Sequence, residues 1–259
     1  MNLTAYWQRI GYEGKAANAA TLAQIQQAHL FAFPFENLDI HYNTPIVCAY
    51  DAMYNKLINR RRGGFCYEQN GLLHQVLTQL GFEVAQVNCR VWREKSQEYS
   101  PDFDHMALLV TINQTVWLAD VGFGAFTFSP LNLSHSYPQT NIGGTYRVLP
   151  MNGLYVIEKE VVKEGLLSWE AEYRFEAKPW PLSAFEARCH YQQTSPQSHF
   201  TQKRLISLPK VDGTRHTITG DVYKVSKAGD TLVEKPIANE AEFKQLLADV
   251  FHVTYPGTA

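Results

Sequence analysis

The chain has 259 residues, which exceeds the usual size of a single hydrophobic core and predicts two or three structural modules. With 45% hydrophobic residues, 19% charged residues and a formal net charge of −2, it has the composition of a soluble globular protein. No long basic run is present, which disfavours a nucleic-acid partner. No apolar stretch reaches the roughly 18 residues that a membrane span needs, and the first residues lack a secretory signal pattern. We therefore expect a cytoplasmic protein with no membrane partner.

The first 83 residues predict a helical part. Thr21 and Gln24 have the spacing of a capping box, and the helix that follows them is expected to end before Pro34. Asp51 is expected to cap a second helix. A third helix is expected to begin at Cys66 and to continue to about residue 80, because leucines and valines recur there at three- and four-residue steps.

Residues 84–187 predict a β-rich part, because the apolar period changes from helical spacing to two. Asn113-Gln114 separates two apolar runs and indicates a tight hairpin. A closed or barrel-like sheet is the expected arrangement. The expected strands cover residues 85–91, 106–112, 115–121, 146–149, 154–162 and 169–175.

Residues 188–259 predict a mixed α/β part. Strands are expected at 205–208 and 215–219, with a turn around Asp212-Gly213 between them. Asn239 and Glu242 have capping-box spacing and predict a final helix. The chain as a whole is therefore expected to have an α+β fold of three parts, covering residues 1–83, 84–187 and 188–259.

The cysteines and histidines indicate a thiol nucleophile and no metal site. The four cysteines contain no C-x-x-C pair, and the histidines contain no H-E-x-x-H, so neither a zinc site nor another catalytic metal is expected. Cys89 lies on the apolar face of an expected strand and is predicted to be a core residue. Cys66 differs, because it follows Arg62-Gly63-Gly64-Phe65 and lies at an expected helix start. Unpaired N–H groups and the positive end of the helix dipole favour a thiolate there.

His105 and Asp120 are candidates for the partners of Cys66. They lie at the same end of the expected hairpin, where an imidazole and an orienting carboxylate can meet. Cysteine, histidine and aspartate together predict a nucleophilic triad. A papain-like protease has its histidine roughly 130–150 residues after its cysteine, so a separation of 39 residues (105 − 66) disfavours that family. Their order in the chain does not show that the three residues lie close together, so each could also be an ordinary core or turn residue.

Three segments resemble the arylamine N-acetyltransferase family, in particular its bacterial members. The first is residues 33–39, Phe-Pro-Phe-Glu-Asn-Leu-Asp, and the second is residues 61–71, Arg-Arg-Gly-Gly-Phe-Cys-Tyr-Glu-Gln-Asn-Gly. The third joins Asp104-His105-Met106 to residues 118–124, Leu-Ala-Asp-Val-Gly-Phe-Gly. Asp104 departs from the pattern, in which a smaller hydroxyl residue is expected beside the histidine. A weaker match is residues 195–200, Ser-Pro-Gln-Ser-His-Phe, and the resemblance extends over nearly the whole chain.

This resemblance implies a helical bundle, a β-barrel and an α/β lid around a cysteine-protease-like core. It implies acetyl-coenzyme A as the co-substrate and no metal. Cys66 would be acetylated, His105 would act as the base, and Asp120 would orient it. The reaction would be a ping-pong N-acetylation of arylamines and arylhydrazines, with O-acetylation of N-hydroxyarylamines as a further reaction. The protein would act as a monomer or a homodimer on small molecules.

The matched segments also suggest binding and supporting residues. Phe35, Phe123 and Phe200 are candidates for a flat acceptor pocket, although core aromatics would give the same pattern. Glu36 and Arg62 either form a buried ion pair that braces the turn before Cys66 or are two separate surface charges. A basic stretch over residues 201–227 is either a solvated face or a phosphate site, with Lys203 and Arg204 as the candidates for the coenzyme.

Two other functions use the same residues. A thiol hydrolase or a transglutaminase-like acyltransferase would use the same triad with water or a glutamine side chain as a partner. A non-catalytic binding module could retain the fold, but an intact Cys66, His105 and Asp120 argues against it. Acetylation of Cys66 by acetyl-coenzyme A, followed by rapid transfer to an amine, distinguishes the transferase from both.

Overall fold

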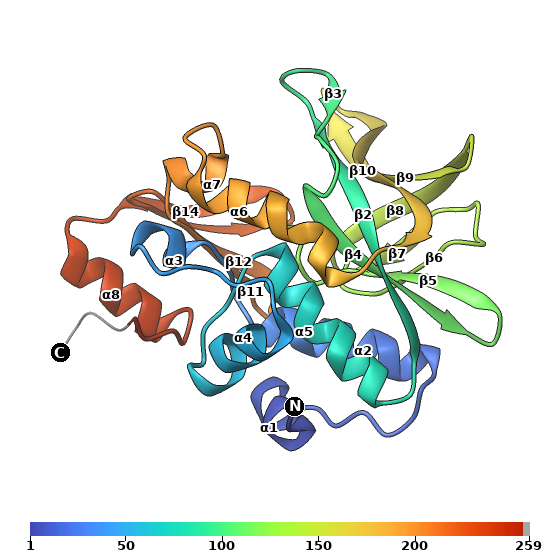
Figure 1. The fold of residues 1–259 in the computed structure, drawn as a ribbon. Coiled ribbons are helices and arrows are strands. Elements are labelled where there is room, and N and C mark those ends of the chain that lie inside the picture. Colours follow the sequence, from blue (N-terminus) through green and yellow to red (C-terminus); the bar gives the residue numbers. More distant parts are fainter. Residues whose placement is uncertain (256–259) are drawn as a thin grey trace.

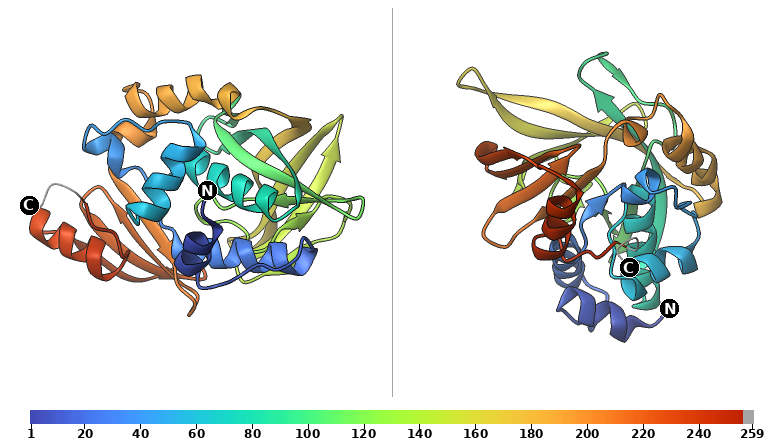
Figure 2. Two further views of the ribbon diagram at one scale, coloured as in Figure 1. Left: turned by 60° about the horizontal axis from the view of Figure 1, so that its bottom comes forward. Right: turned by 90° about the vertical axis from the view of Figure 1, so that its left-hand side faces the viewer.

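The computed structural model describes residues 1–255 and contains a helical N-terminal part and two antiparallel sheets (Figure 1). The helices at the N-terminal end lie below the barrel in this view, and the second sheet with the last helix lies to the left of it. The turned views show the same separation of the two sheets (Figure 2). Among residues 1–255, no helix has the length and apolar character required to cross a bilayer.

The N-terminal part is helical, as predicted, but two helix starts differ from the prediction. The Asn18 side chain accepts from the Thr21 amide, so Asn18 is the cap of the second helix and Thr21 lies inside it. Asp51 lies within the first turn of α4, and its side chain does not cap that helix. The elements are α1 (Leu3–Ile10), α2 (Ala19–Ala32), α3 (Leu38–His41), α4 (Tyr50–Tyr54), a π-helical turn (Asn55–Asn59) and α5 (Cys66–Gln79).

The central part is a strongly curved sheet with strand order β6-β5-β4-β2-β10-β9-β8-β7. Strand β6 contacts β8, so the two ends of the sheet approach each other and the sheet is nearly closed, as a barrel-like fold requires. Its strands are β2 (Glu83–Arg93), β4 (His105–Ile112), β5 (Thr115–Ala119), β6 (Leu131–Asn132), β7 (Gln139–Asn141), β8 (Gly144–Met151), β9 (Leu154–Lys163) and β10 (Leu166–Pro179), with the short β3 (Glu98–Tyr99) paired to β2.

The predicted hairpin within this sheet is confirmed. Asn113 and Gln114 both have positive φ angles, 48° and 67°, and Ile112 pairs with Thr115 across the turn. Two consecutive residues with positive φ are the conformation that lets a two-residue turn follow the twist of its strands. The hairpin aligns β4 and β5, and the two ends that carry His105 and Asp120 lie together.

The C-terminal part contains a second sheet with strand order β1-β11-β12-β13-β14. Its first strand comes from the N-terminal part, because Phe35 pairs with Ser207 across β1 and β11. This pairing brings the segment before the nucleophile against a strand some 170 residues later in the chain (207 − 35 = 172). The elements are β1 (Phe35–Glu36), β11 (Leu205–Pro209), β12 (Thr214–Thr219), β13 (Val222–Lys227), β14 (Asp230–Pro236), a 3-10 turn (Leu182–Phe185), α6 (Glu186–Thr194), α7 (His199–Gln202) and α8 (Glu240–Asp249).

Helix α5 lies between the helical part and the barrel, and this position carries the candidate nucleophile to the sheet. Its buried residues Leu73 and Leu77 belong to one core cluster with Leu108 and Val110 of β4. The interior of the barrel has a core of its own, which includes Cys89 and Tyr173. The first residue of α5 and the first residue of β4 therefore face the same region.

Candidate active site

Cys66 is the first residue of α5 and is almost fully buried, with 4% of its surface exposed. The Glu68 carboxylate accepts from the Phe65 amide at 3.2 Å, which satisfies a backbone N–H group at this helix start. The loop after β5 packs directly on Cys66. A Cβ atom on Gly122 would lie 2.6 Å from the Cys66 Cα, so only glycine fits there.

His105 begins β4 and is bound to Asp120, which directly follows β5. The Nε2 atom of His105 lies 2.7 Å from Oδ2 of Asp120, and both side chains are buried. An ionised carboxylate only accepts hydrogen bonds, so Nε2 carries the proton in this pair and Nδ1 is the acceptor when the ring is neutral. The structure brings His105 and Asp120 into direct contact and places Cys66 and His105 on the wall of one pocket.

Two residues that hold Asp120 were not singled out from the sequence. Asn70 donates to Oδ1 of Asp120 at 2.9 Å and to the Met106 carbonyl at 2.7 Å. The Tyr173 hydroxyl donates to Oδ2 of Asp120 at 3.0 Å. Asn70 lies four residues after Cys66, on the same face of α5, and this spacing is the signal that could have found it. Tyr173 lies in a segment whose sequence pattern predicted a strand and no functional role.

Burial raises the pKa of the Cys66 thiol well above its usual value, and the carboxylates of Asp104 and Asp120 act in the same direction. The backbone groups of Met106 and Tyr67 act in the opposite direction and favour the thiolate. This result is opposite to the lowered pKa expected from the helix start. Loss of water around a buried thiolate outweighs the favourable amide groups while His105 is neutral.

The pocket at Cys66 has a volume of about 300 Å³ and is mostly apolar. The three aromatic residues proposed from the sequence all line it, and they come from three separate elements: Phe35 from β1, Phe123 from the loop after Asp120, and Phe200 from α7. The Phe123 ring meets the His105 ring edge-on at a centroid distance of 5.0 Å. The remaining lining residues are Val91, Arg93, Asp104, Gly122, Gly124, Gln192, His199 and Leu205.

Glu36 and Arg62 form a fully buried ion pair. Nη2 of Arg62 lies 2.6 Å from Oε1 of Glu36, and both side chains have 0% exposure. The pair belongs to a larger cluster that the sequence did not reveal. Asp39 bonds to Arg62 at 3.0 Å, and Lys56 bonds to Asp39 and Glu68, each at 2.9 Å.

The cluster connects this buried charge to the start of α5 through Glu68. Its three carboxylates outnumber its two cations, and burial, together with the charges of Glu36 and Asp39, raises the pKa of Glu68 to about 7 against the lowering effect of Lys56. The Tyr255 ring covers Arg62 at 4.4 Å, and its hydroxyl donates to Asp39. Residues near both ends of the chain therefore meet beneath the turn that carries Cys66.

Asp104 is held by a compact group of partners and does not present an isolated charge to the pocket. Nε and Nη2 of Arg188 donate to one carboxylate oxygen of Asp104, and Gln192 donates to the same oxygen at 2.7 Å. Arg93 lies 3.5 Å from the other oxygen. The acid that departs from the family pattern is thus compensated by arginines from β2 and α6.

Of the two residues suggested for the coenzyme, Arg204 is already engaged and Lys203 is exposed. Nη1 of Arg204 pairs with Glu240 and Nη2 with Asp221, each at 2.7 Å, while its guanidinium lies over the Phe243 ring. These contacts join β11 to α8. Among residues 1–255, no group of three or more His, Cys, Asp or Glu side chains has an arrangement suited to a metal ion.

Comparisons with known proteins identify the family of this chain. A family model described as N-acetyltransferase matches residues 18–257. Human "Arylamine N-acetyltransferase 1" is 31% identical over 276 residues, which cover 98% of this chain and 94% of the relative.

Solved structures with a similar fold belong to the same family. Arylamine N-acetyltransferase from Salmonella typhimurium superposes with a TM-score of 0.89 at 28% identity, covering 97% of this chain and 90% of that chain. The enzyme from Mycobacterium marinum, solved in complex with CoA, superposes with a TM-score of 0.87 at 30% identity, covering 97% and 93%. The chain therefore belongs to the arylamine N-acetyltransferase family and is an acyltransferase.

Proposed function

We propose that the protein transfers an acetyl group from acetyl-coenzyme A to arylamines and arylhydrazines by a ping-pong mechanism through acetyl-Cys66, and that it also O-acetylates N-hydroxyarylamines. The observation that carries the proposal is the pocket of about 300 Å³ that Cys66 and His105 share with three phenylalanines. The acetyl donor is supported by the M. marinum relative, which was solved with CoA.

In the first half-reaction, the sulfur of Cys66 attacks the thioester carbonyl carbon. Nδ1 of His105 takes the thiol proton, because Nε2 is committed to Asp120 at 2.7 Å. A proton on His105 puts a positive charge beside the sulfur and lowers the thiol pKa, in opposition to the effect of burial. The bond from the carbonyl carbon to the coenzyme sulfur then breaks, and the departing thiolate takes the proton from His105.

In the second half-reaction, the amine nitrogen attacks the acetyl carbon of acetyl-Cys66. His105 removes the extra proton from the nitrogen, and the carbon–sulfur bond to Cys66 breaks. The Cys66 thiolate is reprotonated from His105, which returns both residues to their starting state. Phe35 and Phe200, whose ring centroids are 6.1 Å apart, together with Phe123 supply apolar walls suited to a planar ring.

For the coenzyme phosphates, Lys203 remains a candidate because it is exposed and precedes the pocket residue Leu205 by two positions. The contacts of Arg204 with Glu240 and Asp221 favour a structural role for that residue. Lys203→Gln should raise the KM for acetyl-coenzyme A by about a few-fold to tenfold, because one contact to a phosphate would be lost. The KM for the amine should change little.

The proposed function is tested by measuring release of coenzyme A with and without an aromatic amine. A transferase releases one equivalent of coenzyme A quickly and then stops or slows, and it turns over rapidly when aniline or phenylhydrazine is added. Cys66→Ala should abolish both phases. Cys48→Ala is the matched control, because Cys48 is a half-buried thiol that does not line the pocket. Rapid turnover with water alone would instead support the thiol hydrolase.

A further inference from the structure

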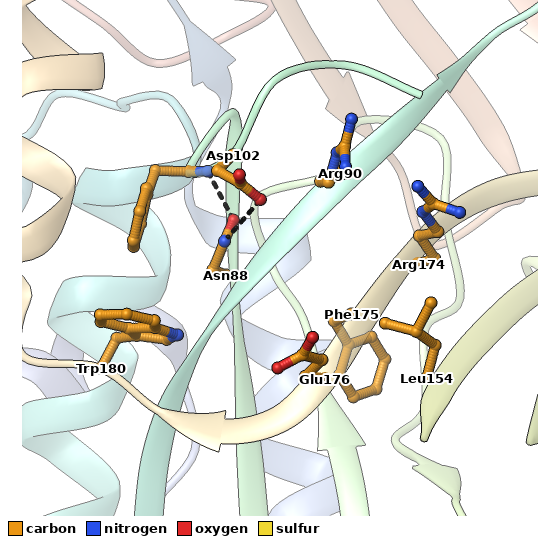
Figure 3. Close-up of a pocket in the computed structure, with 9 residues that line it drawn as sticks. Asn88, Arg90, Asp102, Leu154, Arg174, Phe175, Glu176 and Trp180 are labelled. Atoms are coloured by element: carbon orange, nitrogen blue, oxygen red, sulfur yellow. Dashed lines mark hydrogen bonds between the residues drawn. The ribbon is translucent and has the colours of Figure 1, made fainter. Parts of the chain in front are cut away.

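A second pocket lies on the outer face of the barrel, between β2, β10 and the loop that ends at Phe103 (Figure 3). Its volume is about 370 Å³, within the range of small-molecule sites. It shares no lining residue with the Cys66 pocket. The residues that line it are Asn88, Arg90, Asp102, Phe103, Leu154, Arg174, Phe175, Glu176 and Trp180.

Two arginines form one side of this pocket. In β2, Arg90 follows Cys89, and in β10, Arg174 follows Tyr173; Cys89 and Tyr173 both pack inside the barrel. Because successive side chains of a strand point to opposite faces, Arg90 and Arg174 both lie on the outside. Figure 3 shows their guanidinium groups directed to the same side of the pocket.

These two arginines are direct cross-strand partners. The register of β2 and β10 places Arg174 opposite Arg90, and side chains in such a pair have Cβ atoms roughly 4.5–5.5 Å apart. Like charges directly opposite each other destabilise a sheet. Each guanidinium is nevertheless held in place: Nε of Arg90 donates to the Ser100 carbonyl at 2.6 Å, and the Arg174 guanidinium lies over the Tyr99 ring at 4.1 Å.

Within residues 1–255, no carboxylate forms an ion pair with Arg90 or Arg174. Glu158 of the neighbouring strand β9 forms its ion pair with Arg147. Among the residues that the structure describes, the Arg90 side chain makes one hydrogen bond, and it does so through Nε. Its two terminal amino groups are therefore available to a ligand. A planar arginine fork matches the geometry of a carboxylate, and two forks can hold one such group from both sides.

The rest of the pocket restricts the charge and shape of the ligand. The carboxylates of Asp102 and Glu176 also line it, so its formal charge is balanced and a ligand with one negative charge fits better than a polyanion. In Figure 3 the Glu176 side chain lies across the pocket from the two guanidinium groups. Leu154 and Phe175 add apolar surface near Arg174, and Trp180 lies at the opposite end of the pocket.

We propose that this pocket binds a small organic monocarboxylate, with its carboxylate between Arg90 and Arg174 and its apolar body against Leu154 and Phe175. The bound anion removes the repulsion between the two arginines. The site is independent of acetyl transfer, because none of its lining residues lines the pocket at Cys66.

Calorimetric titration with benzoate, with its uncharged analogue benzamide and with phenyl phosphate tests the proposal on the full chain. Benzoate should bind more tightly than the other two. Arg90→Gln and Arg174→Gln should each weaken benzoate binding by about tenfold or more, since each removes a hydrogen bond to a charged group. Arg60→Gln, which removes an exposed arginine elsewhere, should leave it unchanged. Benzoate should raise the melting temperature of the wild type and not that of either pocket variant.

A crystal soaked with 4-bromobenzoate locates the ligand independently, because the anomalous signal of bromine marks its position. The expected signal lies beside Leu154, with the carboxylate between the two arginines. Bromine only in the Cys66 pocket, equal binding of benzoate and benzamide, tighter binding of phenyl phosphate, or benzoate binding that survives both arginine substitutions would each overturn the proposal. The folding of either variant is checked by its melting temperature without ligand.

Discussion

The hydroxyl of Tyr173 donates to Oδ2 of Asp120 at 3.0 Å, the same oxygen that His105 contacts at 2.7 Å. A residue from β10 thus fixes the carboxylate that orients the candidate base in β4. Asn70 of α5 and the Gly122 amide hold the other oxygen, at 2.9 and 2.8 Å. The carboxylate is therefore positioned by three separate parts of the chain and has little freedom to rotate.

This arrangement predicts that Tyr173→Phe lowers kcat/KM for an aromatic amine by about tenfold, because the lost bond to a charged group is worth roughly 1.5–3 kcal/mol and only part of it orients His105. The variant should still fold. Tyr155→Phe is the control, since Tyr155 stacks on Phe175 and its hydroxyl makes no hydrogen bond within residues 1–255. Equal activity of the two variants would show that Tyr173 does not position Asp120.

Glu36 and Arg62 should be strongly coupled in stability. In a double-mutant cycle with Glu36→Gln and Arg62→Met, we expect a coupling free energy of about 1 kcal/mol or more, because removing one partner leaves the other charged and buried. The half-exposed pair Arg147 and Glu158 is the comparison, and its coupling should stay below about 1 kcal/mol. Additive effects of the Glu36 and Arg62 substitutions would show that the two residues are not energetically coupled.

His29 should make stability depend on pH below neutrality. Burial lowers the pKa of His29 to about 4, and its two ring nitrogens bond to Tyr6 and Gln69. The unfolded chain has a histidine pKa of about 6.5 and binds the extra proton first, so this stability is present above about pH 6.5 and is lost as the pH falls towards 4.

The stability difference between the wild type and His29→Gln should therefore grow by about 3 kcal/mol from pH 4 to pH 6.5. Taking the difference at each pH removes the contribution of Glu68. Its raised pKa gives the opposite slope: that stability is present below the unfolded value of about 4.5 and is lost as the pH rises towards 7. Urea titrations at several pH values provide the measurement, and a difference independent of pH would contradict the burial of neutral His29.

Phe123 should affect the choice of acceptor more than the use of the donor. Its ring lines the pocket and meets His105 edge-on at 5.0 Å. Phe123→Ala should lower kcat/KM for aniline more than tenfold, because apolar area and ring contacts worth roughly 0.5–1.5 kcal/mol are both lost. The rate of acetylation by acetyl-coenzyme A should change much less. A large fall in the rate of acetylation by acetyl-coenzyme A, with an unchanged preference for aniline over a small hydrazine, would contradict this prediction. It would show that the Phe123 ring acts by holding His105.

Local patterns in the sequence were enough to predict helices α2, α4, α5 and α8, most barrel strands and the hairpin at Asn113-Gln114, but not α1, α3, α6 and α7. Strands β13 and β14 were missed for a physical reason. Strand β14 is exposed along its whole length, so no buried face imposes an alternating pattern on its sequence. The strand β1 was missed because it is only Phe35–Glu36, and its partner β11 lies far along the chain.

At the site, the sequence singled out the residues that lie in quoted motifs and missed those whose role depends on tertiary contacts. Cys66, His105, Asp120 and the three phenylalanines are in the first group. Tyr173 and Lys56 are in the second, because an ordinary strand tyrosine and an ordinary lysine give no local signal of the partner that buries them. The raised pKa of Cys66 also depends on burial, which the helix start alone does not reveal.

Peptide mapping of the protein after a single exposure to acetyl-coenzyme A tests the central claim most directly. The account predicts one acetyl group, on the peptide that contains Cys66, and loss of that group when aniline is added to the isolated acetyl-protein, with acetanilide formed in equal amount. Cys66→Ala should carry no acetyl group, and Cys48→Ala should behave as the wild type. Acetyl groups on Cys89 or Cys189 instead, or an acetyl-Cys66 that does not transfer to the amine, would contradict the account.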